Sequence, residues 1–221
     1  MRTCEHAQFR SSQFFLSMDI VAILVAIVSA LALGHYPNEF MKEGEALTWF
    51  SALQLLAIAL MAGRIFFLRQ RTVSFSKFWK SAGFIWFLLF WGFLFLCLDE
   101  LMAIHEGLDR TIHYILDIDR TNLTDRLDDA IVLLYLCFFL VVLYWQRSEL
   151  QRYRQVAPLF KLAIWLVLAM IFFDTLSHTN DIIADKTLNQ WVAATEDSLK
   201  IIAEGLLLGI SCDCLEIAKK L

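Results

Sequence analysis

The sequence predicts an all-α membrane protein, a polytopic bundle of about six transmembrane helices that forms a single integral domain over residues 1–221. Composition is the first reason: 59% of the 221 residues are hydrophobic and the mean hydropathy is +0.60, whereas soluble domains are about half apolar. The second reason is a series of apolar runs long enough to cross roughly 30 Å of hydrocarbon as helices. The third is the scarcity of proline, with 2 Pro against 19 Phe.

Six apolar runs are predicted to span the membrane. They cover residues 14–33, 45–67, 82–105, 129–146, 157–177 and 196–214. No soluble domain follows the first run, so we expect a retained span rather than a cleaved signal peptide. The sixth run is unusual because Glu196, Lys200 and Glu204 fall in its first half. Residues 107–126 form a polar connection whose weak amphipathic pattern is typical of a short surface helix.

The distribution of positive charge predicts the orientation. Most of the 19 basic residues lie in segments on the same side as the two termini, including the linkers 64–80 and 147–161. Short loops rich in Lys and Arg stay in the cytoplasm. Both termini are therefore expected to be cytoplasmic, with the lipid bilayer as the main partner. No motif for a nucleic-acid partner occurs.

Most of the 23 acidic residues lie on the opposite, outer side, and several stand at the outer ends of the apolar runs. Ionisable groups inside spans are costly unless paired or hydrated, so they tend to face a cavity and mark function. The spacing predicts that they converge. Asp99 and Glu106 are two helical turns apart, and Asp174, His178 and Asp181 share one helix face.

The candidate site residues are carboxylates and histidines near the outer ends of spans two to six. They are Glu45, Asp99, Glu100, His105, Glu106, Asp129, Asp174, His178, Asp181 and Glu204. Helix bundles hold metal ions with such ligands from facing helices, and His with Asp or Glu suits zinc, iron or manganese. A divalent metal ion is thus the expected cofactor, and it would relieve repulsion among the carboxylates. No HExxH or similar motif identifies the site.

Some of these acids have a structural alternative. Glu45 and Asp128–Asp129 stand where they would cap the second and fourth spans, and Glu196–Asp197 is a cap signature for the sixth. Asp109 is interpreted as part of a solvated acidic loop. Asp19 and Gln54, within the first two spans, are interpreted as structural.

The segment Leu98-Asp99-Glu100 followed by Ile104-His105-Glu106 resembles a pattern in uncharacterised multi-pass membrane proteins of bacteria. This resemblance implies a bacterial inner membrane, where the site would face the periplasm, and implies no particular activity. A looser similarity is to ceramidase-like membrane hydrolases, which bind zinc among their helices. The chain lacks their His-x-x-x-His pair and their seventh span, so this likeness is an analogy.

Three functions remain open on the sequence alone. The first in rank is a metal-dependent, hydrolase-like membrane enzyme, in which Glu106 and Asp99 are catalytic and a metal-bound water attacks a lipid or small-molecule substrate. The second is a proton- or cation-coupled transporter or channel that uses the same acids, although the inner half of the bundle offers few polar residues. The third is a metal-sensing or structural membrane module.

Overall fold

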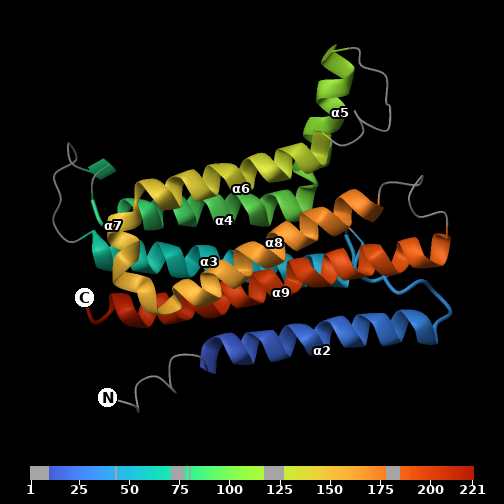
Figure 1. The fold of residues 1–221 in the computed structure, drawn as a ribbon, viewed down its shortest axis with the longest axis horizontal. Coiled ribbons are helices and arrows are strands. Elements are labelled where there is room, and N and C mark those ends of the chain that lie inside the picture. Colours follow the sequence, from blue (N-terminus) through green and yellow to red (C-terminus); the bar gives the residue numbers. More distant parts are fainter. Residues whose placement is uncertain (1–9, 43, 71–77, 80, 117–126, 178–184) are drawn as a thin grey trace.

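The computed structural model describes residues 10–42, 44–70, 78–79, 81–116, 127–177 and 185–221. These residues are almost entirely helical, and no strand occurs among them (Figure 1). The long helices are α2 (Arg10–Ala32), α3 (Ala46–Arg69), α4 (Phe84–Met102), α6 (Leu127–Trp145), α8 (Ala157–Ser177) and α9 (Lys186–Ala218). The short elements are α5 (Ile104–Leu116), α7 (Arg147–Leu150) and the 3-10 helix η3 (Gln151–Val156). The prediction of an all-α fold is confirmed.

Four helical segments of the described chain are long and apolar enough to cross a membrane. They are Ser11–Ala32, Ala46–Arg69, Phe84–Met102 and Arg147–Ser177. Many of their large apolar side chains point outward, and Leu53, Phe67 and Trp165 are all more than half exposed. Such surfaces are stable next to lipid rather than water. Residues Ala130–Trp145 form a shorter apolar helix.

Helix α3 packs against α4 on one side and α9 on another, and α2 and α8 both lie along α9. The buried face of α3 repeats every three or four residues and includes Ala52, Ala59 and Ala62. Such small side chains let neighbouring helix backbones approach closely, which is how membrane helices gain packing contacts.

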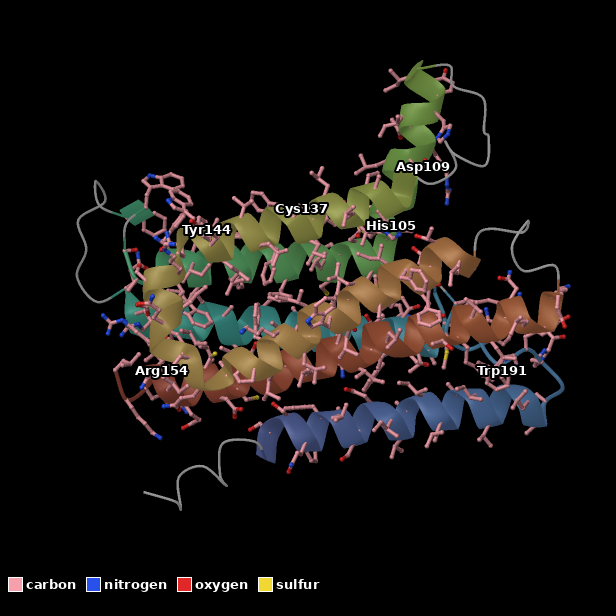
Figure 2. The ribbon with its side chains drawn as sticks, in the orientation of Figure 1. His105, Asp109, Cys137, Tyr144, Arg154 and Trp191 are labelled. Carbon is pink, nitrogen blue, oxygen red and sulfur yellow. The ribbon has the colours of Figure 1, made fainter. Side chains whose placement is uncertain are left out.

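The bundle has two distinct ends, and α2 begins and α9 finishes at the same one (Figure 1). We call this the terminal end, and we call the end at which α4 meets α5 the far end. Tyr144 and Arg154 lie at the terminal end, whereas His105 and Trp191 lie at the far end (Figure 2). Aromatic side chains are exposed at both ends, as with Trp145 (62%) and Trp191 (41%), which matches an interfacial aromatic belt.

A buried ion-pair group closes the terminal end. Arg69, at the end of α3, donates two hydrogen bonds of 2.7 and 3.1 Å to the carboxylate of Glu149 in α7. Arg152 approaches the same carboxylate at 3.0 Å. Tyr153 is buried next to this group and its ring meets Trp86 edge-on at 5.0 Å. The short elements α7 and η3 are thereby fixed to α3 and α4.

Two predicted helix boundaries are wrong. The third span was expected to continue to His105, but α4 ends at Met102, where Ala103 adopts a left-handed backbone (φ 48°), and α5 starts a new direction. The sixth helix begins at Lys186 and not near residue 196, because Asp185 accepts hydrogen bonds from the first-turn amides and caps it there. The proposed cap at Glu196–Asp197 therefore lies inside α9. The short helix expected within 107–126 is present as α5.

Candidate functional site

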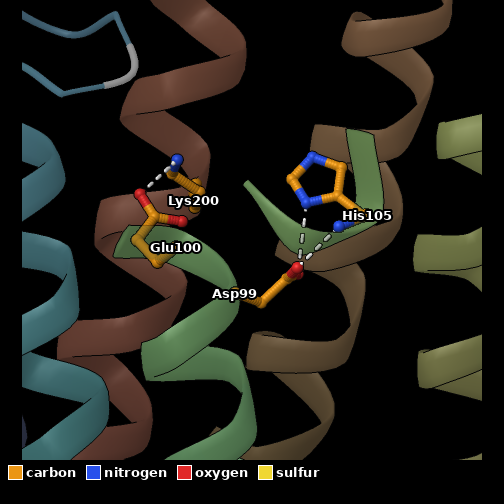
Figure 3. A network of polar contacts seen from close by, with 4 residues as sticks. All are labelled: Asp99, Glu100, His105 and Lys200. Atoms are coloured by element: carbon orange, nitrogen blue, oxygen red, sulfur yellow. Dashed lines mark hydrogen bonds and ion pairs between the residues drawn. The ribbon is translucent and has the colours of Figure 1, made fainter. Parts of the chain in front are cut away.

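Among the side chains that the structure describes, Asp99 and Glu100 at the far end form two pairs with different partners (Figure 3). Asp99 faces His105, and its Oδ2 lies 3.2 Å from the Nδ1 of the imidazole. Glu100 faces Lys200 of α9, which donates a hydrogen bond of 2.9 Å to its carboxylate. Successive residues of an α-helix point about 100° apart. The neighbours Asp99 and Glu100 therefore serve different partners.

The turn at Ala103 explains the first pair. The backbone N–H of His105 donates a 2.8 Å hydrogen bond to Asp99 Oδ1. First-turn amides of a helix have no intrahelical partner, so the buried Asp99 carboxylate caps the start of α5. The same break separates Asp99 from Glu106. The expectation that these two acids share a face of one continuous helix is wrong, and the side chain of Glu106 lies outside the described part of the structure.

Lys200 connects the second pair to acids of other helices. It interacts electrostatically with Glu100 first, and also with Asp197 and Glu204 on its own helix. Asp197 in turn interacts with Asp174 of α8. Helices α4 and α9 therefore supply three carboxylates around a single ammonium group, and α8 adds Asp174 next to one of them, so the group as a whole is acidic.

A second polar group lies deeper in the bundle, and we call its four residues the acid centre. They are Asp19 of α2, Ser51 and Gln54 of α3, and Glu204 of α9. Gln54 donates a 2.6 Å hydrogen bond from Nε2 to Asp19 Oδ1. The Glu204 carboxylate interacts electrostatically with Glu100 and Lys200 first. It also lies beside the Ser51 hydroxyl and interacts more weakly with Asp19. All four side chains are buried, and Asp19 and Ser51 have no exposed surface.

Each residue of the acid centre retains an oxygen without a hydrogen-bond partner among the described residues. These atoms are Asp19 Oδ2, Ser51 Oγ, Gln54 Oε1 and Glu204 Oε2. Buried polar atoms are nearly always hydrogen-bonded, to protein or to ordered water, and a buried carboxylate requires neutralisation. Protons or water at the acid centre would satisfy these four oxygens.

Two glycines bring α2 close enough to α9 to form the acid centre. A Cβ at Gly205 would overlap the carboxylate of Asp19, and a Cβ at Gly209 would overlap Ser12. Glycine is the one residue that permits a side chain to lie directly on a helix backbone in this way. The Gly205–Gly209 spacing of four residues places both on the face of α9 that meets α2.

Polar side chains continue from the acid centre toward both ends of α9. Toward the terminal end, Asp213 is buried and interacts with Ser11 of α2. Toward the far end stand Lys200 and Asp197 with their partners. Asp197 and Asp213 are separated by about 24 Å along the helix axis, which approaches the roughly 30 Å thickness of a bilayer's hydrocarbon core. A discontinuous polar path thus runs along α9 between apolar helices.

The remaining predicted site residues divide into two groups. Glu45 is exposed at the N-terminus of α3 and makes no side-chain capping bond there. His178 and Asp181 lie outside the described residues, as does the side chain of Asp129. Among the described residues, no three His, Cys, Asp or Glu side chains are placed to hold a metal ion together. The described residues therefore lack the expected metal site.

The sequence did not predict the buried pairs formed by Asp19 with Gln54 and by Asp109 with His113. Asp19 and Gln54 were interpreted as structural, yet they pair with each other in the acid centre. The signal was present, because Asp19 is the sole acid in a long apolar run, and the argument applied to Asp99 applies equally to it. Asp109 was expected in a solvated loop, but it is buried in α5 with its Oδ1 3.1 Å from His113 Nδ1.

Comparison with known proteins gives a family and no relative of known activity. No match to this chain was found among the curated proteins or the solved structures. The model of a family described as a domain of unknown function, DUF8692, matches residues 15–214, from within α2 to the last turns of α9. Because this match covers most of the chain, the protein belongs to the DUF8692 family.

Proposed function

We propose that this protein is a multi-pass membrane protein that moves protons across the bilayer, alone or together with a solute, by way of the acid centre. The observation that carries the proposal is the pair of buried carboxylates, Asp19 and Glu204, each with an oxygen lacking a partner among the described residues. Residues that serve only packing would be matched with hydrogen-bond partners, whereas groups that bind and release a proton need a vacant acceptor.

The proposed topology has six crossings, with α6 and α9 added to the four most apolar segments. Helix α9 carries too many charges to be recognised by composition, but it is surrounded by α2, α3 and α8, which contact it along the bundle. Its charged side chains would then face protein rather than lipid. Both termini would be cytoplasmic, as the excess of Lys and Arg near the terminal end supports, in a bacterial inner membrane.

A proton fits the acid centre better than a metal ion does. Asp19 Oδ2 lies against the backbone of Gly205, where there is no space for a methyl group, so one side of this carboxylate is closed to a coordinated ion. The centre offers two carboxylates, an amide and a hydroxyl, and no imidazole. A buried carboxylate is costly while it is charged, and binding a proton neutralises it.

The route would use the polar groups in their order along α9. A proton entering at the far end would meet the carboxylates around Lys200, pass to Glu204 and Asp19, and leave near Asp213 at the terminal end. Lys200, which donates a hydrogen bond to Glu100, would hold a fixed positive charge that limits the number of protons in the path. Transfer between these positions requires intervening water or small side-chain movements.

The test is proton flux in liposomes that contain the purified protein and a trapped pH-sensitive dye. With an imposed pH gradient and a potassium diffusion potential, the native protein should acidify the lumen faster than empty liposomes. Asp19→Asn and Glu204→Gln, which keep shape and remove the exchangeable proton, should reduce the protein-dependent rate at least about tenfold. Glu39→Gln, an exposed acid paired with Lys42, is the matched control and should leave it unchanged.

Two results would contradict the proposal. One is a native rate equal to that of empty liposomes in both directions of the gradient. The other is full flux in both Asp19→Asn and Glu204→Gln, since a path that does not need either carboxylate is not the one described here. Circular dichroism of each variant establishes that the helices are retained.

The metal-dependent membrane hydrolase is a second candidate, and one observation favours it. The Asp99–His105 pair has the carboxylate–imidazole arrangement that orients metal-binding or general-base histidines in enzymes. The further ligands, including the proposed general base Glu106, would come from side chains outside the described part of the structure. Elemental analysis separates the two candidates, because stoichiometric zinc, iron or manganese in the native protein and its loss in His105→Ala would favour the hydrolase.

A further inference from the structure

A groove on the surface of the terminal end is formed where α3 and α9 meet. It encloses about 380 Å³ and is lined by Arg64, Phe67, Leu68, Leu215 and Lys219. Three of these residues are apolar and two are basic. The groove lies closer to the C-terminal ends of α3 and α9 than the acid centre does, and none of its lining residues belongs to the proposed proton path.

One of the two basic residues of the groove is paired with an acid and the other is not. Lys219 is half exposed and pairs with Glu216 one turn earlier on α9, so these two groups nearly cancel. Arg64 is exposed and has no ion-pair or hydrogen-bond partner among the residues that the structure describes. The groove therefore carries about one uncompensated positive charge next to apolar surface.

The depth of Arg64 matters as well. It stands five residues before the end of α3, which is about 7.5 Å along the helix axis, and Phe67 beside it is 76% exposed. Arg side chains near the end of a membrane helix extend toward the headgroup layer while their stems stay in the apolar region. In the proposed topology, a guanidinium at this position would reach the level of the lipid phosphates, and the apolar lining would face the first part of the acyl chains.

We propose that this groove binds an anionic phospholipid, with its phosphate on Arg64 and Lys219 and an acyl chain along Phe67, Leu68 and Leu215. A lipid with one net negative charge neutralises the unpaired guanidinium of Arg64. A zwitterionic lipid carries a positive group as well, so the positive charge of the groove remains uncompensated. Basic pockets between membrane helices on the cytoplasmic side bind such headgroups. This assignment is independent of the proton path.

The experiment is a lipid titration of the detergent-purified full chain, followed by native mass spectrometry. Phosphatidylglycerol and phosphatidylcholine with identical acyl chains are added in equal amounts. The native protein should retain phosphatidylglycerol preferentially as a one-to-one adduct, and Arg64→Gln should weaken this adduct about tenfold. Lys219→Gln should weaken it to a smaller extent, because Glu216 already offsets part of that charge.

Two matched controls remove equal charge elsewhere. Arg154→Gln is at the same end but outside the groove, and Lys42→Gln breaks an exposed pair of the same i,i+3 spacing as Lys219–Glu216. Both should retain phosphatidylglycerol as the native protein does. Equal retention of the two lipids, or an unchanged adduct in Arg64→Gln, would overturn the proposal. Displacement of the lipid by inorganic phosphate alone would assign the groove to a free anion and would also overturn it.

Discussion

Asp19 has no exposed surface, accepts one hydrogen bond from Gln54, and lies directly on the backbone of Gly205. A carboxylate in such a place is destabilising by several kcal/mol unless it is neutralised. Replacing it with a well-packed apolar residue is often neutral or stabilising, so stability alone does not account for an acid here. The proton-binding role that we propose gives a reason for this residue at this position.

The contact between Gly205 and Asp19 gives a prediction about stability. Gly205→Ala adds a methyl group where the Asp19 carboxylate lies, so the α2–α9 contact must open, and we expect a loss of about 1–3 kcal/mol. Gly92→Ala is the control, because a Cβ at Gly92 meets nothing within 4 Å and alanine favours the helix. Thermal unfolding in detergent is the measurement. An unchanged midpoint for Gly205→Ala would show that α2 does not pack on α9 in this way.

At the scale of elements, hydropathy predicts the positions of the apolar helices. It does not predict the arrangement of residues at the far end. Runs of Leu, Ile and Phe long enough to cross a bilayer gave the positions of α3, α4 and α8 to within a few residues. The break at Ala103 was not predicted, because alanine favours helix and carries no turn signal. Asp99 capping the next helix stabilises that turn. This cap forms only in the folded chain, so no repeating pattern in the sequence predicts it.

The start of α9 also differs from the prediction, because a segment interpreted as a loop is helical. Residues 186–195 are polar enough to be interpreted as a loop, but Asp185 caps them into the first turns of a helix that continues to Ala218. The two-turn spacing of Asp99 and Glu106 assumed one straight helix, and the helix breaks between them. Lys200 and Glu204 both lie within α9, where the four-residue spacing places them on one face and they interact electrostatically.

The terminal-end ion pairs yield a prediction at the scale of elements. Glu149→Gln removes the carboxylate that fixes α7 to α3 and leaves Arg69, whose side chain is 12% exposed, without its partner. Removing one member of a buried pair costs about 3 kcal/mol or more. Glu216→Gln, which removes an exposed acid with 62% of its side chain accessible, should change the midpoint little. Equal midpoints for both variants would contradict the proposed role of Glu149.

At the scale of the whole molecule, the polar and apolar residues are distributed unequally among the helices. The outward surfaces of α2, α3, α4 and α8 are apolar. Acids from several of these helices instead face α9, which carries acids of its own. A helix of this composition is tolerated in a membrane when other helices cover it, because its polar groups then find partners inside the protein. The proposed function depends on this arrangement, since a proton path needs polar groups or water between them within apolar walls.

The most direct test of the proposed path is an infrared difference spectrum of the membrane-reconstituted protein between two pH values. If Asp19 and Glu204 exchange protons with the surrounding water, carboxyl C=O bands of buried acids appear on acidification, and bands assigned by Asp19→Asn and Glu204→Gln disappear in the respective variants. Glu39→Gln should leave these bands in place. A native spectrum without pH-dependent bands from buried carboxyl groups would contradict the account, because acids that never change protonation do not carry protons.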